Sequence, residues 1–115
     1  MEETCIFCKI IQKQLPATIL LDDPELIVIE DIKPRAPSHF LIIPKQHIAT
    51  INNTENQDQQ LLGYMILTAK KIAQLKALND FGYRLVFNVN PGGGQDVYHI
   101  HLHLLGGRQM TWPPG

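Results

Sequence analysis

The sequence predicts a single α+β domain over residues 1–115, with an about five-stranded antiparallel sheet, one long helix and a short N-terminal helix. Short runs of β-forming side chains between turn residues predict the strands, and one long segment with apolar residues at helical spacing predicts the main helix. The chain is 44% hydrophobic, which suits one compact core, and its 115 residues are too few for two.

The N-terminal elements are a short helix and a β-hairpin. Apolar residues recur at helical spacing from position 6 to position 11, which predicts a helix over about 6–13. Two runs rich in β-forming residues follow at 18–21 and 26–29, separated by the turn cluster Asp22-Asp23-Pro24. We therefore expect these two strands to pair with each other.

A third strand is predicted over residues 39–43. Pro34 and Pro37 prevent regular pairing just before it, and Pro44 is expected to end it because proline has no backbone N–H to donate.

The long helix is predicted from its start signal and its apolar stripe. Thr54-x-x-Gln57 has the pattern of a capping box, and apolar residues at helical spacing continue from there to about Leu78. The residues at 79–82, Asn-Asp-Phe-Gly, are expected to end this helix.

Two further strands are predicted over 83–88 and 98–105, separated by the glycine-rich segment 90–96. Because most connections between the strands are short, we expect an antiparallel sheet that is covered on one face by the long helix.

Charge and composition exclude several classes of partner. Ten basic and eleven acidic residues give a net charge of −1, which provides no field for a long nucleic acid, although a single nucleotide needs only a local site. No apolar stretch is long enough to span a membrane, and the N-terminus has no secretory pattern. The two cysteines lie three positions apart, so we expect a reducing, cytoplasmic location.

Three of the five histidines alternate with apolar residues near the C-terminus. On a strand, His99, His101 and His103 would line one side of the sheet, while Ile100 and Leu102 would point into the opposite layer. A solvated sheet face or a bare metal patch is the alternative, but a solvated face would normally carry Thr, Lys or Glu. A neutral imidazole can attack phosphorus and leave again, because its ordinary pKa is about 6.5.

These residues resemble the histidine triad (HIT) family, whose signature His-φ-His-φ-His-φ-φ, with φ apolar, is complete here at 99–105. The resemblance covers nearly the whole chain, including Asp31-Ile32, His39-Phe40-Leu41, Pro44-Lys45-x-His47 and Gly93-Gly94-Gln95. The ending Trp112-Pro113-Pro114-Gly115 is similar to that of the histidine triad nucleotide-binding branch, the purine nucleoside phosphoramidases.

The resemblance implies a hydrolase that cleaves purine nucleoside phosphoramidates to a nucleoside monophosphate and an amine. His101 would attack the α-phosphorus to form a nucleotidyl-histidine, which water then hydrolyses. His103 would contact the phosphate or the bridging atom, and the backbone around His99 would orient the other ring nitrogen of His101. His39 would support the triad from behind, with a surface histidine as the alternative.

Two other functions stay open at this point. One is a dinucleoside polyphosphate hydrolase from another branch of the family, and the other is a nucleotide-binding regulatory module with vestigial activity. The short chain and the Trp112 ending favour the phosphoramidase.

The resemblance also assigns contacts to the nucleotide. Asp31 would accept hydrogen bonds from the ribose hydroxyls, and Asn88 would bind the phosphate or the leaving group, although a turn aspartate and a strand-end cap are the simpler alternatives. Backbone N–H groups of a glycine-rich turn, here at Gly94 and Gln95, can meet a phosphate, while a flexible hairpin loop is the alternative.

The purine slot implied by the resemblance is apolar, and ordinary core packing is the alternative for its residues. Ile29 stands where many relatives have an aromatic ring, which puts stacking on the base in doubt. The residues implied are Phe7, Ile10, Ile29 and Ile32.

Asp96 departs from the family pattern, because the nucleotide-binding branch commonly has serine at this position. An ionised carboxylate there would repel the substrate phosphate. We therefore expect Asp96 to turn away, to be held protonated or to change the preferred leaving group.

A zinc site is the second departure from the animal members of the branch. Cys5-x-x-Cys8 resembles histidine triad relatives that carry zinc, in which His47 and His99 would complete a tetrahedral set. Such a structural Zn²⁺ would tie the first helix to the histidine strand. A redox pair or two buried small residues are the alternatives.

A homodimer is also implied by the resemblance. The long helix and strand 83–88 would extend the sheet across a two-fold axis. The tail at 105–115, including Trp112, would lie near an active site and reach toward the site of the partner subunit.

Overall fold

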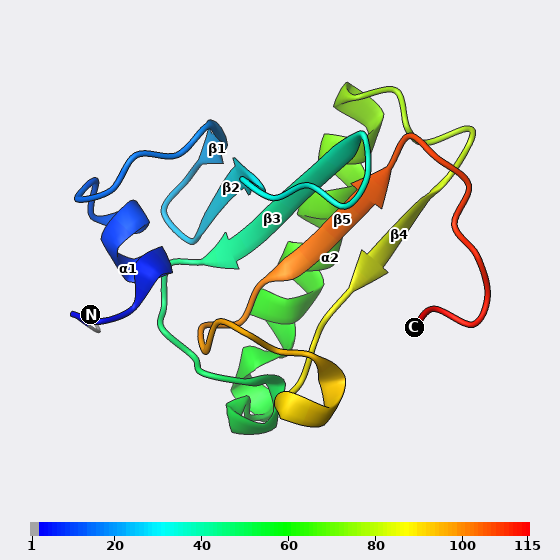
Figure 1. Cartoon of the computed structure of the whole chain (residues 1–115). Coiled ribbons are helices and arrows are strands. Elements are labelled where there is room, and N and C mark those ends of the chain that lie inside the picture. The colour runs from blue at the N-terminus through cyan, green and yellow to red at the C-terminus, as the bar shows by residue number, and fades with distance from the viewer. Residues whose placement is uncertain (1–2) are drawn as a thin grey trace.

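The computed structural model describes residues 3–115 and confirms the five-stranded antiparallel sheet (Figure 1). The strand order across the sheet is β1-β2-β3-β5-β4, so β1 and β4 are the two edges. The strands are β1 (Ile19–Asp22), β2 (Leu26–Glu30), β3 (Ser38–Pro44), β4 (Tyr83–Val86) and β5 (Leu102–Gly106). The helices are α1 (Ile6–Ile11) and α2 (Gln59–Leu75), and short 3₁₀ turns span Ile51–Asn53, Asn56–Asp58 and Pro91–Gly93.

The two faces of the sheet bury different residues, because successive side chains of a strand point to opposite sides. Leu26 and Val28 of β2 join the core under α2, which crosses one face of the sheet (Figure 1). Ile27 and Ile29 of the same strand pack with Phe7 of α1 on the other face. The sequence predicts a sheet that is covered on one face. The structure differs in that α1 covers part of the second face.

The last strand is shorter than the predicted 98–105. β5 pairs with β3 from Ser38 opposite Gly106 to Ile42 opposite Leu102, and the pairing stops there. Pro44 has no N–H for the ladder, and the N–H of Ile100 instead donates to the carbonyl of Ile48 at 2.7 Å. His99 and His101 consequently lie in irregular backbone before the strand, and only His103 is on it.

The start of α2 also differs from the prediction. The expected capping box at Thr54 and Gln57 is wrong, because the Thr54 hydroxyl donates to the carbonyl of Ile51 at 2.7 Å. The reciprocal contact lies one residue later, where the N–H of Glu55 donates to the carboxylate of Asp58 at 2.8 Å. A 3₁₀ turn therefore precedes the helix.

Both helices end earlier than the sequence predicts. Ala77 adopts a left-handed φ of 57°, and the N–H of Leu78 donates to the carbonyl of Ala73 at 2.8 Å, which closes α2 before Gly82 is reached. Lys13, with a φ of 64°, leaves the helical conformation two residues after α1 ends. Among the described residues, no helix combines the length and the apolar character needed to cross a membrane.

Candidate active site and metal centre

A cavity of about 570 Å³ brings together most of the residues implied for nucleotide binding. Its walls come from α1 and the segment that follows it, the end of β2 with the next connection, β3, the loop after β4 and the start of β5. The predicted site residues that line it are Phe7, Ile10, Ile29, Asp31, Ile32, His39, Asn88, Gly94, Asp96, His101 and His103.

Three of the residues predicted for catalysis or nucleotide binding lie apart from this cavity. His99 is fully buried behind it, and its ring faces two thiols. Trp112 is 83% exposed and is absent from the cavity walls. Gln95 is buried, and its side-chain amide donates to the carbonyls of Ala49 and Val97 at 2.7 and 3.0 Å.

Backbone N–H groups of the glycine-rich loop donate to carbonyl groups of the same loop. Those of Gly93 and Gln95 donate to the carbonyl of Asn90, and that of Gly94 donates to Pro91, all at 3.1 Å. Gly94 has a φ of 79°, which glycine adopts without strain. The side-chain amide of Asn88 donates to the carbonyl of Gly93 at 2.8 Å, so it braces the loop as well as lining the cavity.

His101 is held with a free lone pair on one ring nitrogen. Its Nδ1 lies 2.8 Å from the carbonyl oxygen of His99, and a carbonyl only accepts, so Nδ1 carries the proton and Nε2 keeps the lone pair. Phe7 packs edge-on against the ring, with the two centroids 5.0 Å apart. Burial lowers the pKa of His101, so the ring is neutral at pH 7.

The tautomer of His103 is set by a chain of three groups. The N–H of Arg35 donates to Nδ1 of His39 at 3.0 Å, so in neutral His39 the proton sits on Nε2. That Nε2 lies 2.9 Å from Nδ1 of His103 and 3.5 Å from the carboxylate of Asp31, and the shorter contact is the hydrogen bond. Nδ1 of His103 therefore accepts, which leaves its proton on Nε2.

Burial lowers the pKa of His103 to about 4 and also lowers that of His39. Both rings are therefore neutral at pH 7, and His103 acts as a hydrogen-bond donor from Nε2. Asp31, His39 and His103 also place ligand atoms within 4.8 Å of one another. A cation there would have to displace the Nε2 proton of His39, whose other nitrogen is occupied by Arg35, so we assign this group to hydrogen bonding.

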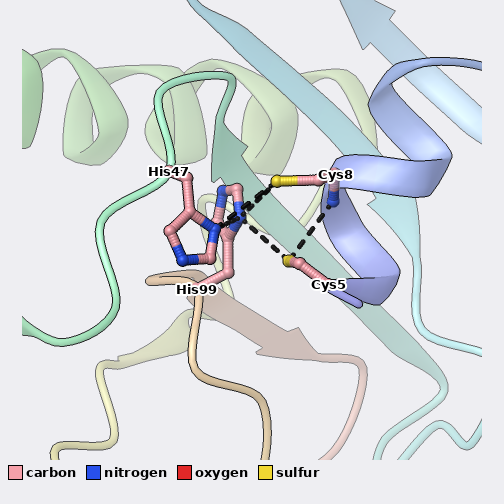
Figure 2. Close-up of side chains that lie close together, drawn as sticks. All are labelled: Cys5, Cys8, His47 and His99. Carbon is pink, nitrogen blue, oxygen red and sulfur yellow. Dashed lines mark hydrogen bonds between the residues drawn. The ribbon is translucent and has the colours of Figure 1, made fainter. Parts of the chain in front are cut away.

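A second cluster of donor atoms lies behind the cavity, where α1, the loop after β3 and the segment before β5 meet (Figure 2). Its members are Cys5, Cys8, His47 and His99, and their ligand atoms all lie within 4.8 Å of one another. Sγ of Cys5 is 3.3 Å from Nδ1 of His99, and Sγ of Cys8 is 3.4 Å from Nδ1 of His47. The two Nδ1 atoms are 3.1 Å apart.

This cluster has the donor chemistry of a structural zinc site. Nε2 of His99 donates to the carbonyl of Pro44 at 2.7 Å, so the lone pair of its Nδ1 faces the thiols and His47. Burial lowers the pKa of His99 to about 4, which keeps that lone pair available at neutral pH. Two sulfur and two nitrogen donors converging on one point fit Zn²⁺.

Two groups in this arrangement have no clear signal in the sequence. The N–H of Arg35 fixes His39 only because the connection after β2 folds back onto β3, and the Pro44 carbonyl orients His99 across a separation of 55 residues. The contact of Phe7 with both His99 and His101, at centroid distances of 5.9 and 5.0 Å, likewise depends on how α1 docks.

The chain is similar to several known proteins over almost its full length. Residues 4–112 match the family described as scavenger mRNA decapping enzyme C-term binding. An uncharacterised HIT-like protein of Synechococcus elongatus is 49% identical over 115 residues, covering 100% of both chains. A 14 kDa zinc-binding protein of Zea mays is 48% identical over 112 residues, covering 96% of this chain and 87% of that protein. The crystal structure of a HIT family hydrolase from Legionella pneumophila is 61% identical, with a TM-score of 0.96, and the match covers 97% of this chain and 100% of that chain.

Proposed function

The chain belongs to the histidine triad family, and from that premise we propose that it hydrolyses purine nucleoside phosphoramidates to a nucleoside monophosphate and an amine. The observation that carries the proposal is the tautomer of His101. Its Nδ1 proton is held by the His99 carbonyl, so Nε2 presents a lone pair where the ring lines the cavity. A neutral, oriented imidazole is the nucleophile that this chemistry needs.

In the first step, Nε2 of His101 forms a bond to phosphorus while the phosphorus–nitrogen bond of the substrate breaks. The departing nitrogen takes a proton from water, and the ring keeps its Nδ1 proton on the His99 carbonyl. In the second step, water attacks phosphorus, the bond to Nε2 breaks and the proton of that water returns to solvent. His103 supports both steps by donating from Nε2 to the phosphoryl group.

The remaining cavity residues suit the nucleoside. Phe7, Ile10 and Ile29 offer a buried apolar surface to a flat base, and the half-buried carboxylate of Asp31 suits two ribose hydroxyls. One oxygen of Asp31 already accepts from the N–H of Lys33 at 2.8 Å, which fixes its orientation.

We propose Zn²⁺ as the ion that Cys5, Cys8, His47 and His99 hold. When bound, it would link α1 to the segment that carries the nucleophile, which is a structural rather than a chemical contribution. The chemistry itself then belongs to His101 and to the groups that orient it.

A homodimer completes the proposal. β4 is an edge strand, and an edge presents unpaired backbone groups that a second copy can match. The neighbouring helix α2 exposes Ile66, Leu67 and Leu75, at 46%, 63% and 74%. Sedimentation at micromolar concentration is expected to give a dimer, and a monomer would exclude this assembly.

The test of the proposed function is capture of the intermediate. Rapid quenching with adenosine 5′-phosphoramidate, followed by mass spectrometry, is expected to show a nucleotide adduct on His101. His101→Ala is expected to form no adduct and to lose turnover, while its melting temperature shows that it still folds. Hydrolysis of a dinucleoside polyphosphate with no attack on the phosphoramidate would instead favour the other branch of the family.

A further inference from the structure

One carboxylate in the cavity wall, that of Asp96, forms no ion pair with any described residue. Asp96 is exposed and lines the same cavity as His101 and His103. It is the only acidic or basic residue, histidines aside, between Phe87 and His101.

The two cationic side chains that line the cavity, Lys33 and Arg35, come from the connection near the C-terminal end of β5. The register places Ser38 opposite Gly106 and Ile42 opposite Leu102, so the connection before β3 lies at the C-terminal end of β5. That connection carries Lys33 and Arg35, together with Asp31. The loop that carries Asp96 leads into the N-terminal end of β5, and Figure 1 shows the two connections at opposite ends of the strand.

The two ends suggest how a substrate lies. With the ribose at Asp31 and the phosphate between His101 and His103, the amine on phosphorus would extend toward Asp96. A carboxylate there repels the phosphate anion and any anionic leaving group, whereas a positive charge on the amine would lie between the two negative groups and offset their repulsion.

We propose that Asp96 selects phosphoramidates whose departing amine carries an additional positively charged group, such as an aminoalkyl chain. This inference rests on the proposed function, because it names the leaving group of that reaction. Of the three outcomes expected for Asp96 from the sequence, it corresponds to a changed leaving group, and it is supported by the position of Asp96 in the cavity wall.

The test uses three adenosine 5′-phosphoramidates with the same four-carbon linker, which ends in an ammonium, a methyl or a carboxylate group. The native protein is expected to show kcat/KM in the order ammonium, methyl, carboxylate, with steps on the order of five- to tenfold. Asp96→Asn and Asp96→Ser are expected to compress the three values to within about twofold. Raising the salt concentration is expected to shrink the steps in the native protein.

The matched control is Asp80→Asn, which removes the same charge from an exposed turn outside the cavity and is expected to keep the native order. Equal kcat/KM for the three compounds in the native protein, or an unchanged order in both Asp96 variants, would overturn the inference and leave the proposed function intact.

A second measurement separates failure of the reaction from failure of the inference. Calorimetric binding of the same three compounds to His101→Ala is expected to follow the same order of affinity. If the native protein cleaved none of them and this order persisted, the proposed reaction would fail while selection by Asp96 stood. If the affinities were equal, selection by Asp96 would fail.

Discussion

The carbonyl oxygen of His99 accepts a hydrogen bond from Nδ1 of His101 at 2.8 Å, while Nδ1 of His99 itself lies 3.3 Å from the thiol of Cys5. One residue therefore orients the candidate nucleophile through its backbone and faces the donor cluster through its ring. Phe7 lies between the two cysteines in the chain and contacts both rings. The candidate metal centre, which includes the N-cap residue Cys5, and the candidate nucleotide cavity therefore share α1.

Removal of metal is the first prediction, because α1 and its N-cap supply Cys8 and Cys5 to the cluster, and α1 supplies Phe7 to the cavity. Protein purified without chelator is expected to hold about one zinc ion per chain, and Cys8→Ser to hold much less. Chelation is expected to lower the melting temperature and to weaken binding of a nucleoside monophosphate several-fold. Metal analysis, thermal unfolding and calorimetry measure these three quantities.

The outcome that contradicts this prediction is equally specific. A reduced protein with negligible zinc, and with the same melting temperature before and after chelation, would show that the four residues pack together without an ion. Weakened nucleotide binding after chelation with an unchanged melting temperature would instead place the effect in the cavity alone.

Replacement of His39 is the second prediction. His39→Ala removes the donor to Nδ1 of His103, so the proton of His103 is no longer confined to Nε2. We expect kcat to fall by about tenfold with a smaller change in KM, because the donor to the phosphoryl group is present only part of the time.

The tautomer itself provides the decisive readout. Nitrogen NMR of the His103 ring is expected to show a proton on Nε2 in the native protein and a mixture in His39→Ala. His39→Gln, whose amide N–H reaches a similar position, is expected to restore both the tautomer and much of kcat. A native spectrum with the proton on Nδ1 would contradict the chain from Arg35 to His103.

Much of the fold follows from local patterns in the sequence, whereas several element ends do not. Alternation and turn residues predict the five strands and the long helix, because those signals act over neighbouring residues. The late start of β5 depends on Pro44 of its partner strand, and the end of α2 depends on Ala77 adopting a conformation that usually favours glycine. Pro44 lies in another segment of the chain, and alanine at position 77 gives no signal for a left-handed conformation.

In the candidate site, too, some features can be predicted from the sequence and others depend on contacts between distant segments. The family signature indicates which histidines belong together, but the proton positions on His101 and His103 come from the His99 carbonyl and the Arg35 N–H. Backbone groups have no residue identity, so a sequence pattern does not predict which of them a side chain will meet. Only the folded connection between β2 and β3 places Arg35 against His39.

Two glycine substitutions form the third prediction, because their surroundings differ. A Cβ at Gly106 would lie 2.9 Å from Cδ1 of the buried Leu78, whereas a Cβ at Gly63 would meet nothing within 4 Å. Gly106→Ala is expected to lower the free energy of unfolding by about 1–3 kcal/mol through overpacking. Gly63→Ala, on the exposed side of α2, is expected to raise it by about 0.5–1 kcal/mol. Denaturant unfolding measures both, and a stable Gly106→Ala would show that Leu78 moves aside freely.

The ion pairs of Asp22 give a fourth prediction, on the acid stability of the N-terminal hairpin. Its carboxylate binds the ammonium groups of Lys13, at 2.7 Å, and of Lys45. These two ion pairs connect β1 to the segment after α1 and to the loop after β3. Hydrogen bonds from both lysines lower the pKa of Asp22 from 3.8 to about 2. Because the folded pKa is depressed, the stabilisation is present above pH 4 and is lost as the pH falls toward 2. The melting temperature of Asp22→Asn is therefore expected to lie slightly below the native value at pH 7 and to converge with it near pH 2. A difference in melting temperature that stays constant over this range would assign the effect to packing instead of charge.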